Sequence, residues 1–261
     1  MKVNLPDENN QTPVFYAIRH GHIRSLRALL TDYRIDVNWR DRTDTTPISL
    51  AAALGFANKV GVLCTSGADI GIQDQEEQIS LHHAARFGHH LVIRVLLSYG
   101  IDIINSNDHF GDTPLHHAAR NGRILVTREL LKRPTLYLHG ANKKGETPLH
   151  LAARFGHHLI ISVLLLHDRT LANVKNHNED TALHEAASSG HTSAVYELLR
   201  YETTSINEEN SAGAKPLHLA ILHHHLGIVQ LLLNKRSGYN LHRSPSRGWK
   251  LLGHFFLVSQ V

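Results

Sequence analysis

One short pattern recurs along this chain at a nearly constant period. Its copies start 34, 33, 34, 34, 34 and 34 residues apart, and the fourth copy reads "TPLHHAARNGR". A fixed period of this length indicates a repeat architecture, in which each unit contacts only the units before and after it. The chain is therefore expected to form a solenoid of seven units, which start at Thr12, Thr46, Ile79, Thr113, Thr147, Thr181 and Lys215.

The residue types within one copy predict two short helices. Threonine can cap a helix start, and proline suits the first helical position because its missing N–H is not needed there. Paired alanines such as Ala118 and Ala119 allow helices to approach closely, and Gly122 can adopt the left-handed conformation that ends a helix. An apolar run such as "LVTRELL" follows with helical spacing, which predicts a second helix with one buried face.

The "TPLHxA" signature and the period near 33 resemble the ankyrin repeat, and the resemblance covers residues 2–234. It implies an all-α solenoid of helix-turn-helix units with projecting β-hairpin fingers, and a concave face made of the first helices and the fingers. The segments "LLKRPTLYLHGANKKGETPLHLAA" and "LLLHDRTLANVKNHNEDTALHEAA" resemble the plant membrane-associated defence regulators of this family. Those proteins carry a C-terminal membrane domain, whereas this sequence has no run of 18 uncharged apolar residues.

Charge divides the sequence into a body and a tail. The formal net charge is +4, and residues 235–261 contribute +5 because they hold five basic residues and no acid, which leaves −1 for residues 1–234. We interpret residues 1–234 as an ankyrin-repeat domain of seven repeats. Residues 235–261 are either a degenerate capping repeat, which would cover the apolar end of the stack, or a divergent basic and apolar tail.

The repeat explains many of the 23 histidines. Equivalent residues of stacked helices lie roughly 8–10 Å apart, whereas zinc needs its ligand nitrogens within about 2 Å of one ion. We therefore expect no metal along either histidine column, and the resemblance implies that the "TPLH" histidine bonds the backbone of the neighbouring finger. One column follows the leucine, and the other follows the glycine: His82, His116, His150, His184 and His218; His22, His89, His157, His191 and His225.

No motif in the sequence predicts catalysis. There is no "GxxxxGK[ST]" phosphate loop and no "GxSxG" nucleophile elbow, and "HEAAS" from His184 lacks the second histidine of a zinc-protease motif. The single cysteine, Cys64, lies in the apolar run "KVGVLC", where a buried packing role is expected rather than a nucleophile. We expect no enzyme activity, no catalytic residue, no cofactor and no small-molecule substrate.

The resemblance implies that partners are held by residues that vary between copies, at the finger tips and on the exposed side of the first helix. In the three central copies these positions carry in-phase arginines and several aromatics, the types that most often anchor protein interfaces. The alternative is that the arginines are solvated members of a locally duplicated sequence. The candidate partner-binding residues are Arg86, Phe87, His109, Phe110, Arg120, Asn121, Lys143, Lys144, Arg154 and Phe155.

These observations favour a monomeric, non-enzymatic scaffold or adaptor that binds a protein partner with an acidic or aromatic segment. Two alternatives stay open: a regulatory ankyrin part of a larger membrane or signalling protein, or association of the basic tail with an anionic membrane or nucleic acid. Because residues 1–234 are nearly neutral, we do not expect this part of the chain to bind nucleic acid or a membrane. One cysteine and no signal-peptide stretch favour a cytoplasmic location, with the nucleus as the alternative.

Overall fold

The computed structural model describes residues 3–236, in which every repeat folds into a first and a second helix. The first helices are α1 (Pro13–Arg19), α3 (Pro47–Ala53), α5 (Ser80–Phe87), α7 (Pro114–Arg120), α9 (Pro148–Arg154), α11 (Ala182–Ser188) and α13 (Pro216–Leu222). The second helices are α2 (Ile23–Leu30), α4 (Ala57–Thr65), α6 (His90–Tyr99), α8 (Ile124–Leu130), α10 (His158–His167), α12 (Thr192–Leu199) and α14 (Leu226–Arg236). Two 3₁₀ helices, η1 (Asp102–Asn105) and η2 (Arg169–Asn173), lie after α6 and α10. The expected all-α solenoid is confirmed.

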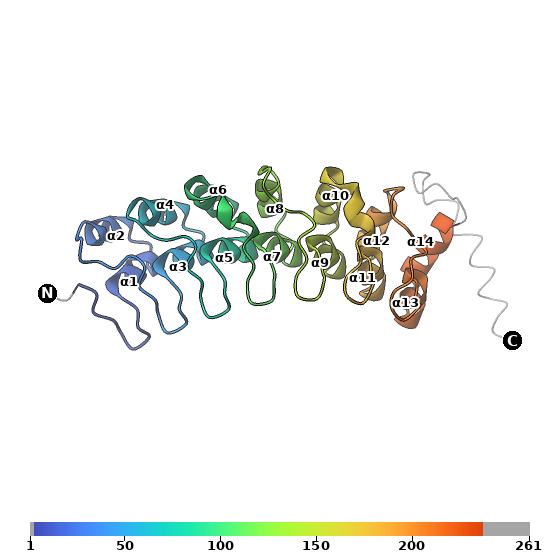
Figure 1. Ribbon diagram of the computed structural model, residues 1–261, viewed down its shortest axis with the longest axis horizontal. Helices are drawn as coiled ribbons and strands as arrows, with labels where there is room; N and C mark the ends of the chain where they lie inside the picture. The colour runs from blue at the N-terminus through green and yellow to red at the C-terminus, as the bar shows by residue number, and fades with distance from the viewer. Residues whose placement is uncertain (1–2, 237–261) are drawn as a thin grey trace.

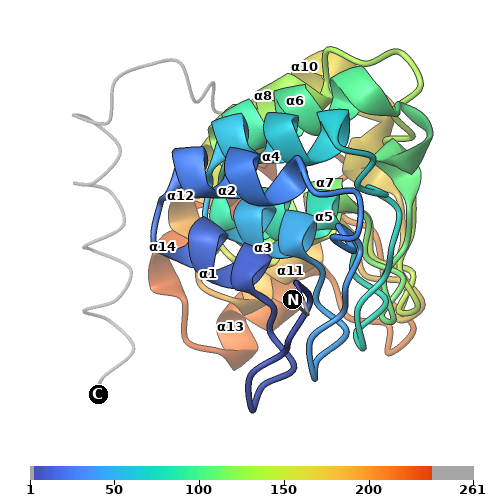
Figure 2. The same ribbon diagram turned by 90° about the vertical axis from the view of Figure 1, so that its left-hand side faces the viewer.

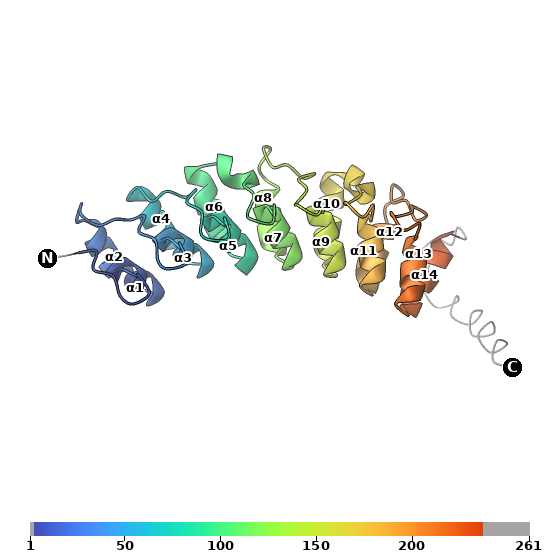
Figure 3. The same ribbon diagram turned by 60° about the horizontal axis from the view of Figure 1, so that its bottom comes forward.

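The helices form two rows that run the length of the molecule. The first helices make one row, the second helices make the other, and the loops between repeats project on the far side of the first row (Figure 1). Seen from below, the rows follow an arc rather than a straight line (Figure 3). The view along the rows shows the projecting loops gathered at one edge of the stack (Figure 2).

The core is continuous from the first repeat to the last. Each first helix packs on the first helices before and after it, as α5 does on α3 and α7, and on its own second helix. The leucine and the two alanines of the central copies are fully buried, as Leu115, Ala118 and Ala119 show. Burial thus comes from stacking copies on one another, as expected for units too small to hide their own apolar faces.

The backbone at the ends of the first helices matches most of the expectations. Proline occupies the first helical position of five first helices, and the glycine that ends each of the first six copies of the motif has a positive φ. Threonine caps fewer helices than expected: the hydroxyls of Thr46 and Thr113 accept a helix N–H at 3.3 and 3.4 Å, but those of Thr147 and Thr181 do not. The hydroxyls of Thr113, Thr147 and Thr181 all lie 2.8–2.9 Å from Nδ1 of the "TPLH" histidine of the same repeat.

The loops between repeats are narrow fingers. We number fingers 1 to 7 by repeat, and each is closed by a backbone bond between residues four apart, at 7–11, 41–45, 74–78, 108–112, 142–146, 176–180 and 210–214. Adjacent fingers are joined by backbone bonds, such as the N–H of Lys143 to the carbonyl of Phe110 at 3.0 Å. The expected hairpin shape is present, but no residue of 3–236 belongs to a β-strand, because one closing bond per finger is too little for a ladder.

The expected cap or tail at the C-terminal end of the chain stays a prediction. Residues 237–261, which include nearly all of the proposed cap or tail, lie outside the described residues. Among the described helices, none has the length and apolar character that a membrane crossing requires.

Candidate partner-binding surface

The "TPLH" histidines bind each repeat to the next. Nε2 of four of them lies 2.9–3.1 Å from a backbone carbonyl oxygen at the base of the following finger. All four rings are fully buried between repeats. The structural role that the resemblance implied is confirmed for His82, His116, His150 and His184, whose acceptors are Asp112, Glu146, Asp180 and Ala214.

These contacts fix the protonation state of the rings. A carbonyl oxygen can only accept a hydrogen bond, so Nε2 carries the proton. Nδ1 is then the acceptor, and it receives the main-chain N–H of the residue that starts the repeat, at 3.0–3.2 Å. Burial lowers the pKa of His82 to about 4 and also lowers the pKa values of His116, His150 and His184. The histidines are therefore neutral structural links.

The second histidine column binds repeats in the opposite direction. Nε2 of His89, His157 and His225 lies 3.0–3.1 Å from a carbonyl near the end of the preceding first helix. In the fourth copy Arg123 takes this place and donates Nε to the carbonyl of Arg86 at 3.0 Å. The interface between two neighbouring repeats can therefore hold one side-chain donor from the preceding repeat and one from the following repeat.

Glycine at the end of a first helix leaves room for this contact. Gly122 has φ of 69°, and a Cβ atom there would lie 2.8 Å from Cε1 of His157. Both the left-handed backbone and the lack of space therefore require glycine. The seventh repeat places His224 at this position with φ of 58°, and no eighth repeat follows it among the described residues.

An aspartate or asparagine organises every finger. Its Oδ1 accepts the main-chain N–H groups two and four residues later, as Asp108 does from Phe110 and Asp112, both at 2.9 Å. The same pair of bonds recurs at each finger base, so the finger tips are held in one conformation. The seven organising residues are Asp7, Asp41, Asp74, Asp108, Asn142, Asn176 and Asn210.

Two of the three in-phase arginines are held by buried carboxylates. Arg120 forms an ion pair with Asp112, the last residue of finger 4, which is 2% exposed. The other carboxylate oxygen of Asp112 accepts from Asn142 of the next finger at 2.8 Å. Arg120 therefore has a structural role, since it holds finger 4 against α7. Its guanidinium also lies 6.0 Å from the centre of the Phe155 ring.

Arg154 is held more tightly, because two carboxylates share it. It pairs with Glu146 of its own repeat, and its Nε and Nη2 donate to Glu185 of the next repeat at 2.9 and 2.6 Å. These bonds to Glu185 raise the pKa of the guanidinium. Burial would raise the pKa of Glu146, but the hydrogen bond from Asn142 and the charge of Arg154 outweigh it and hold that pKa below its usual value. The pairs join repeats 5 and 6.

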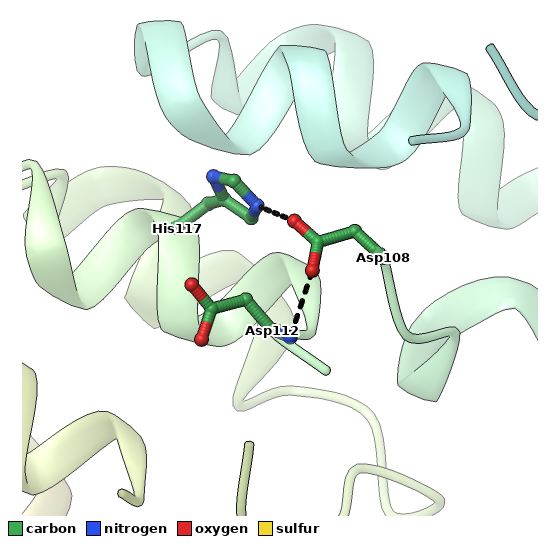
Figure 4. A group of neighbouring side chains, drawn as sticks. All are labelled: Asp108, Asp112 and His117. Carbon is green, nitrogen blue, oxygen red and sulfur yellow. Dashed lines mark hydrogen bonds and ion pairs between the residues drawn. The ribbon is translucent and has the colours of Figure 1, made fainter. Parts of the chain in front are cut away.

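One buried group has the composition of a metal site. Ligand atoms of Asp108, Asp112 and His117 lie within 4.8 Å of one another (Figure 4). His117 donates Nε2 to Asp108 at 2.8 Å, and the other oxygen of Asp108 accepts two backbone N–H groups. The carboxylate of Asp112 is taken by Arg120 and Asn142. Every carboxylate oxygen thus has a protein donor, which supports a structural role for the group.

The remaining candidates lie on the surface of repeats 3 to 5. Arg86 is exposed, pairs with no carboxylate in the described part of the chain, and lies 5.7 Å from the centre of the Phe87 ring. The exposed fractions of Phe87, Phe110 and Phe155 are 46%, 56% and 42%. Finger tips carry His109 and Phe110 in repeat 4 and Lys143 and Lys144 in repeat 5, and Asn121 is half-buried at the end of α7.

A further set of side-chain contacts between neighbouring repeats was not predicted from the sequence. Asparagines eight residues before the repeat start bridge backbones: Asn105 donates to the carbonyl of Thr135 at 2.8 Å and accepts the N–H of Tyr137 at 2.9 Å. In repeat 5, His139 instead pairs with Asp168 at 2.8 Å. The recurrence of asparagine in phase was the signal available, at Asn4, Asn38, Asn105 and Asn173.

Known proteins resemble this chain in sequence and fold. The chain is 32% identical to mouse Rabankyrin-5 over 109 residues, 41% of this chain and 9% of that protein. It is 30% identical to the probable 26S proteasome regulatory subunit p28 of Saccharomyces cerevisiae over 116 residues, 43% of this chain and 51% of that protein. The match to the Drosophila melanogaster E3 ubiquitin-protein ligase Ufd4 is 35% identical and spans 4% of that protein. The chain thus spans between 4% and about half of the lengths of these relatives.

A solved structure has the same fold. The crystal structure of the ankyrin repeat domain of Bcl-3 superposes with a TM-score of 0.73 at 23% identity, over 85% of this chain and 100% of that one. The family model for ankyrin repeats in three copies matches residues 1–74, 48–141, 81–175, 133–209 and 164–244. Together with the seven stacked helix pairs, these matches mean that the chain belongs to the ankyrin repeat family.

Proposed function

We propose that this chain is a non-enzymatic scaffold or adaptor that holds a protein partner across its fingers and first-helix ends in repeats 3 to 5. Ankyrin repeats are general protein–protein interaction modules. The partner would carry an aromatic or acidic segment, and the chain would act as a monomer in the cytoplasm or the nucleus.

The observation that carries the proposal is the exposure of three aromatic rings above a rigid frame. Phe87, Phe110 and Phe155 are about half exposed, and the fingers and helix ends that bear them are fixed by buried histidine and carboxylate bonds. Exposed aromatics on pre-organised backbone lose little conformational entropy on binding. The central repeats therefore offer better anchors than the polar tips of fingers 1 and 7.

The chemistry of the described residues supports a role without catalysis. The histidines of the repeat are committed to backbone bonds, and the buried carboxylates near them have protein donors. Burial raises the pKa of the Cys64 thiol to about 11, so it is protonated and unreactive at neutral pH. These groups serve the frame rather than a substrate.

A paired comparison tests the proposal. Phe87→Ser with Phe155→Ser should remove partner proteins captured from a native extract and identified by mass spectrometry. Leu91→Ser with Leu159→Ser is the matched control, because these leucines are similarly exposed but lie on second helices α6 and α10. The control should capture the same partners as the unchanged protein. Partners that survive the phenylalanine changes, or leave with the leucines, would contradict the assignment to this face.

The alternative is that the chain is the regulatory ankyrin part of a larger signalling or membrane protein. Its support is that the chain spans only 4% to 51% of the lengths of the relatives described above. Sequencing full-length transcripts across the locus would show whether further domains continue the reading frame. Binding through the basic tail is the other alternative, and deletion of residues 235–261 should then remove a salt-dependent affinity.

A further inference from the structure

A basic hollow lies between fingers 5 and 6. Its volume is about 390 Å³, and it is lined by Lys143, Lys144, Glu146, Arg154, His177 and Asn178, among others. The lysines, His177 and Asn178 are exposed at its mouth, whereas Glu146 is buried beneath them. Neither lysine pairs with a carboxylate within residues 3–236, so their charge is available to a partner.

The acids near this hollow are already neutralised by the protein. Glu146 and Glu185 both bind Arg154, and each also accepts from an asparagine, at 3.0 and 3.1 Å. The exposed Glu179 of finger 6 lies 3.7 Å from Lys175. The three cations of the hollow therefore outnumber the two carboxylates held by Arg154, and the cations at the mouth attract an anion.

The finger tips change character in order along the stack. The tip of finger 3 carries Glu76 and Glu77, that of finger 4 carries Phe110, and that of finger 5 carries the two lysines. Neighbouring repeats are about 10 Å apart, and an extended chain rises about 3.3 Å per residue, so one repeat corresponds to about three partner residues. An extended segment crossing these tips would meet acid, then aromatic, then base.

We propose that the basic hollow binds a carboxylate side chain of an extended partner segment, about three residues beyond an apolar side chain seated at Phe110. A basic residue of the same segment would lie against Glu76 and Glu77 on the other side, which fixes the direction of the segment. This inference rests on the proposed function, because it names the chemistry of the partner on the same surface.

The test uses a phage-displayed library of random peptides of about twelve residues, enough to cross three fingers. The unchanged protein should select peptides with an aspartate or glutamate at a fixed spacing from an aromatic residue. Binding of a selected peptide, measured by fluorescence anisotropy, should weaken about tenfold in Lys143→Glu with Lys144→Glu, as expected for one lost charge-assisted hydrogen bond. The doubly reversed protein should itself select lysine or arginine at that position.

The control is Arg94→Glu with Arg128→Glu, which changes the net charge equally on exposed positions of α6 and α8. The control should bind the peptide with unchanged affinity. If it lost as much affinity as the lysine variant, the effect would come from net charge alone, and the proposal would be overturned. A separate experiment uses a peptide in which phosphoserine replaces the acidic residue. If only the phosphorylated peptide bound, the ligand of the basic hollow would be a phosphoryl group and not a carboxylate.

The two levels of inference fail differently. Selected peptides that lack a fixed acid but lose affinity on Phe87→Ser with Phe155→Ser would overturn the basic hollow and leave the proposed function standing. Selected peptides that respond to neither set of changes would contradict both.

Discussion

At the scale of single residues, the "TPLH" histidine shows how one neutral ring serves three groups. Nε2 of His150 donates to the carbonyl of Asp180, while Nδ1 accepts the N–H of Thr147 and lies within hydrogen-bond distance of its hydroxyl. Protonation of Nδ1 would turn an acceptor into a donor facing an N–H group. The buried histidines therefore couple folding to pH.

As the pH falls, the folded chain should lose stability before the pH reaches the usual pKa values of carboxylic acids. The pKa of His82 is about 4 in the folded chain and about 6.5 when unfolded, so the unfolded chain binds more protons between these values. Stability is thus highest above about pH 6.5 and falls toward pH 4, with His82 alone contributing about 3 kcal/mol of the loss. Urea denaturation followed by circular dichroism from pH 7.5 to 4.5 measures this.

The control for that experiment separates buried from exposed rings. His82→Gln should flatten the pH profile, whereas His158→Gln, at an exposed position of α10, should leave it unchanged. An unfolding midpoint that stays constant between pH 7.5 and 5 would show that these rings do not govern stability.

At the scale of helices and fingers, a column of identical residues hides different roles. Arg86, Arg120 and Arg154 occupy one position of the repeat, yet only Arg86 has no carboxylate partner in the part of the chain that is described. The difference comes from the last residue of the finger, which is Gln78 in repeat 3 but an acid in repeats 4 and 5. The last residue of the finger thus determines whether the arginine forms an ion pair with a buried carboxylate.

Charge reversal along this column should affect stability unequally. Arg154→Glu places a third carboxylate beside Glu146 and Glu185 and should lower the free energy of unfolding by at least about 2 kcal/mol. Arg86→Glu should change it by less than about 0.5 kcal/mol, because no buried partner is lost. Chemical denaturation of both variants provides the comparison, and equal losses would mean that the pairing of Arg154 contributes nothing.

The sequence predicted the helix pairs and the two histidine columns, because their signal repeats in every copy. It could not assign the roles of Arg120 and Arg154: the contact of Arg120 with Asp112 depends on how finger 4 folds back onto α7, and the contact of Arg154 with Glu185, 31 residues away, depends on the stacking of repeats. Lys59 carried no signal either: this buried lysine donates to the carbonyl of Ile18 at 2.6 Å and lies 3.4 Å from the centre of the Phe56 ring. Finding it required knowledge of which carbonyl faces α4.

At the scale of the whole molecule, burial is concentrated in the middle of the stack. Six of the seven residues of α9 are buried, against two in α13 and one of the eight in α2. A repeat array gains its stability from interfaces with neighbours, and the end units have one interface fewer. Opening should therefore start at the ends.

Hydrogen exchange can follow this order along the chain. Amides of α5, α7 and α9 should exchange only through the largest openings, whereas those of α2 and α13 should exchange at least about tenfold faster through local fraying. Mass spectrometry of proteolytic fragments resolves these segments. Uniform protection from α1 to α14 would show a single cooperative unit instead.

The two histidine columns have a consequence for how such a chain changes length. One column donates toward the C-terminus and the other toward the N-terminus, so a junction recognises positions in the repeat rather than particular neighbours. Duplication or loss of one complete 34-residue unit would leave the donors and acceptors at the new boundary matched. The 33-residue unit between Thr46 and Ile79 keeps its contact from His89 to the carbonyl of Ala53, so the match depends on complete units rather than on one exact length. A duplication that ended inside a unit would leave these donors and acceptors unpaired, so the array can grow or shrink by gene duplication only in whole-unit steps.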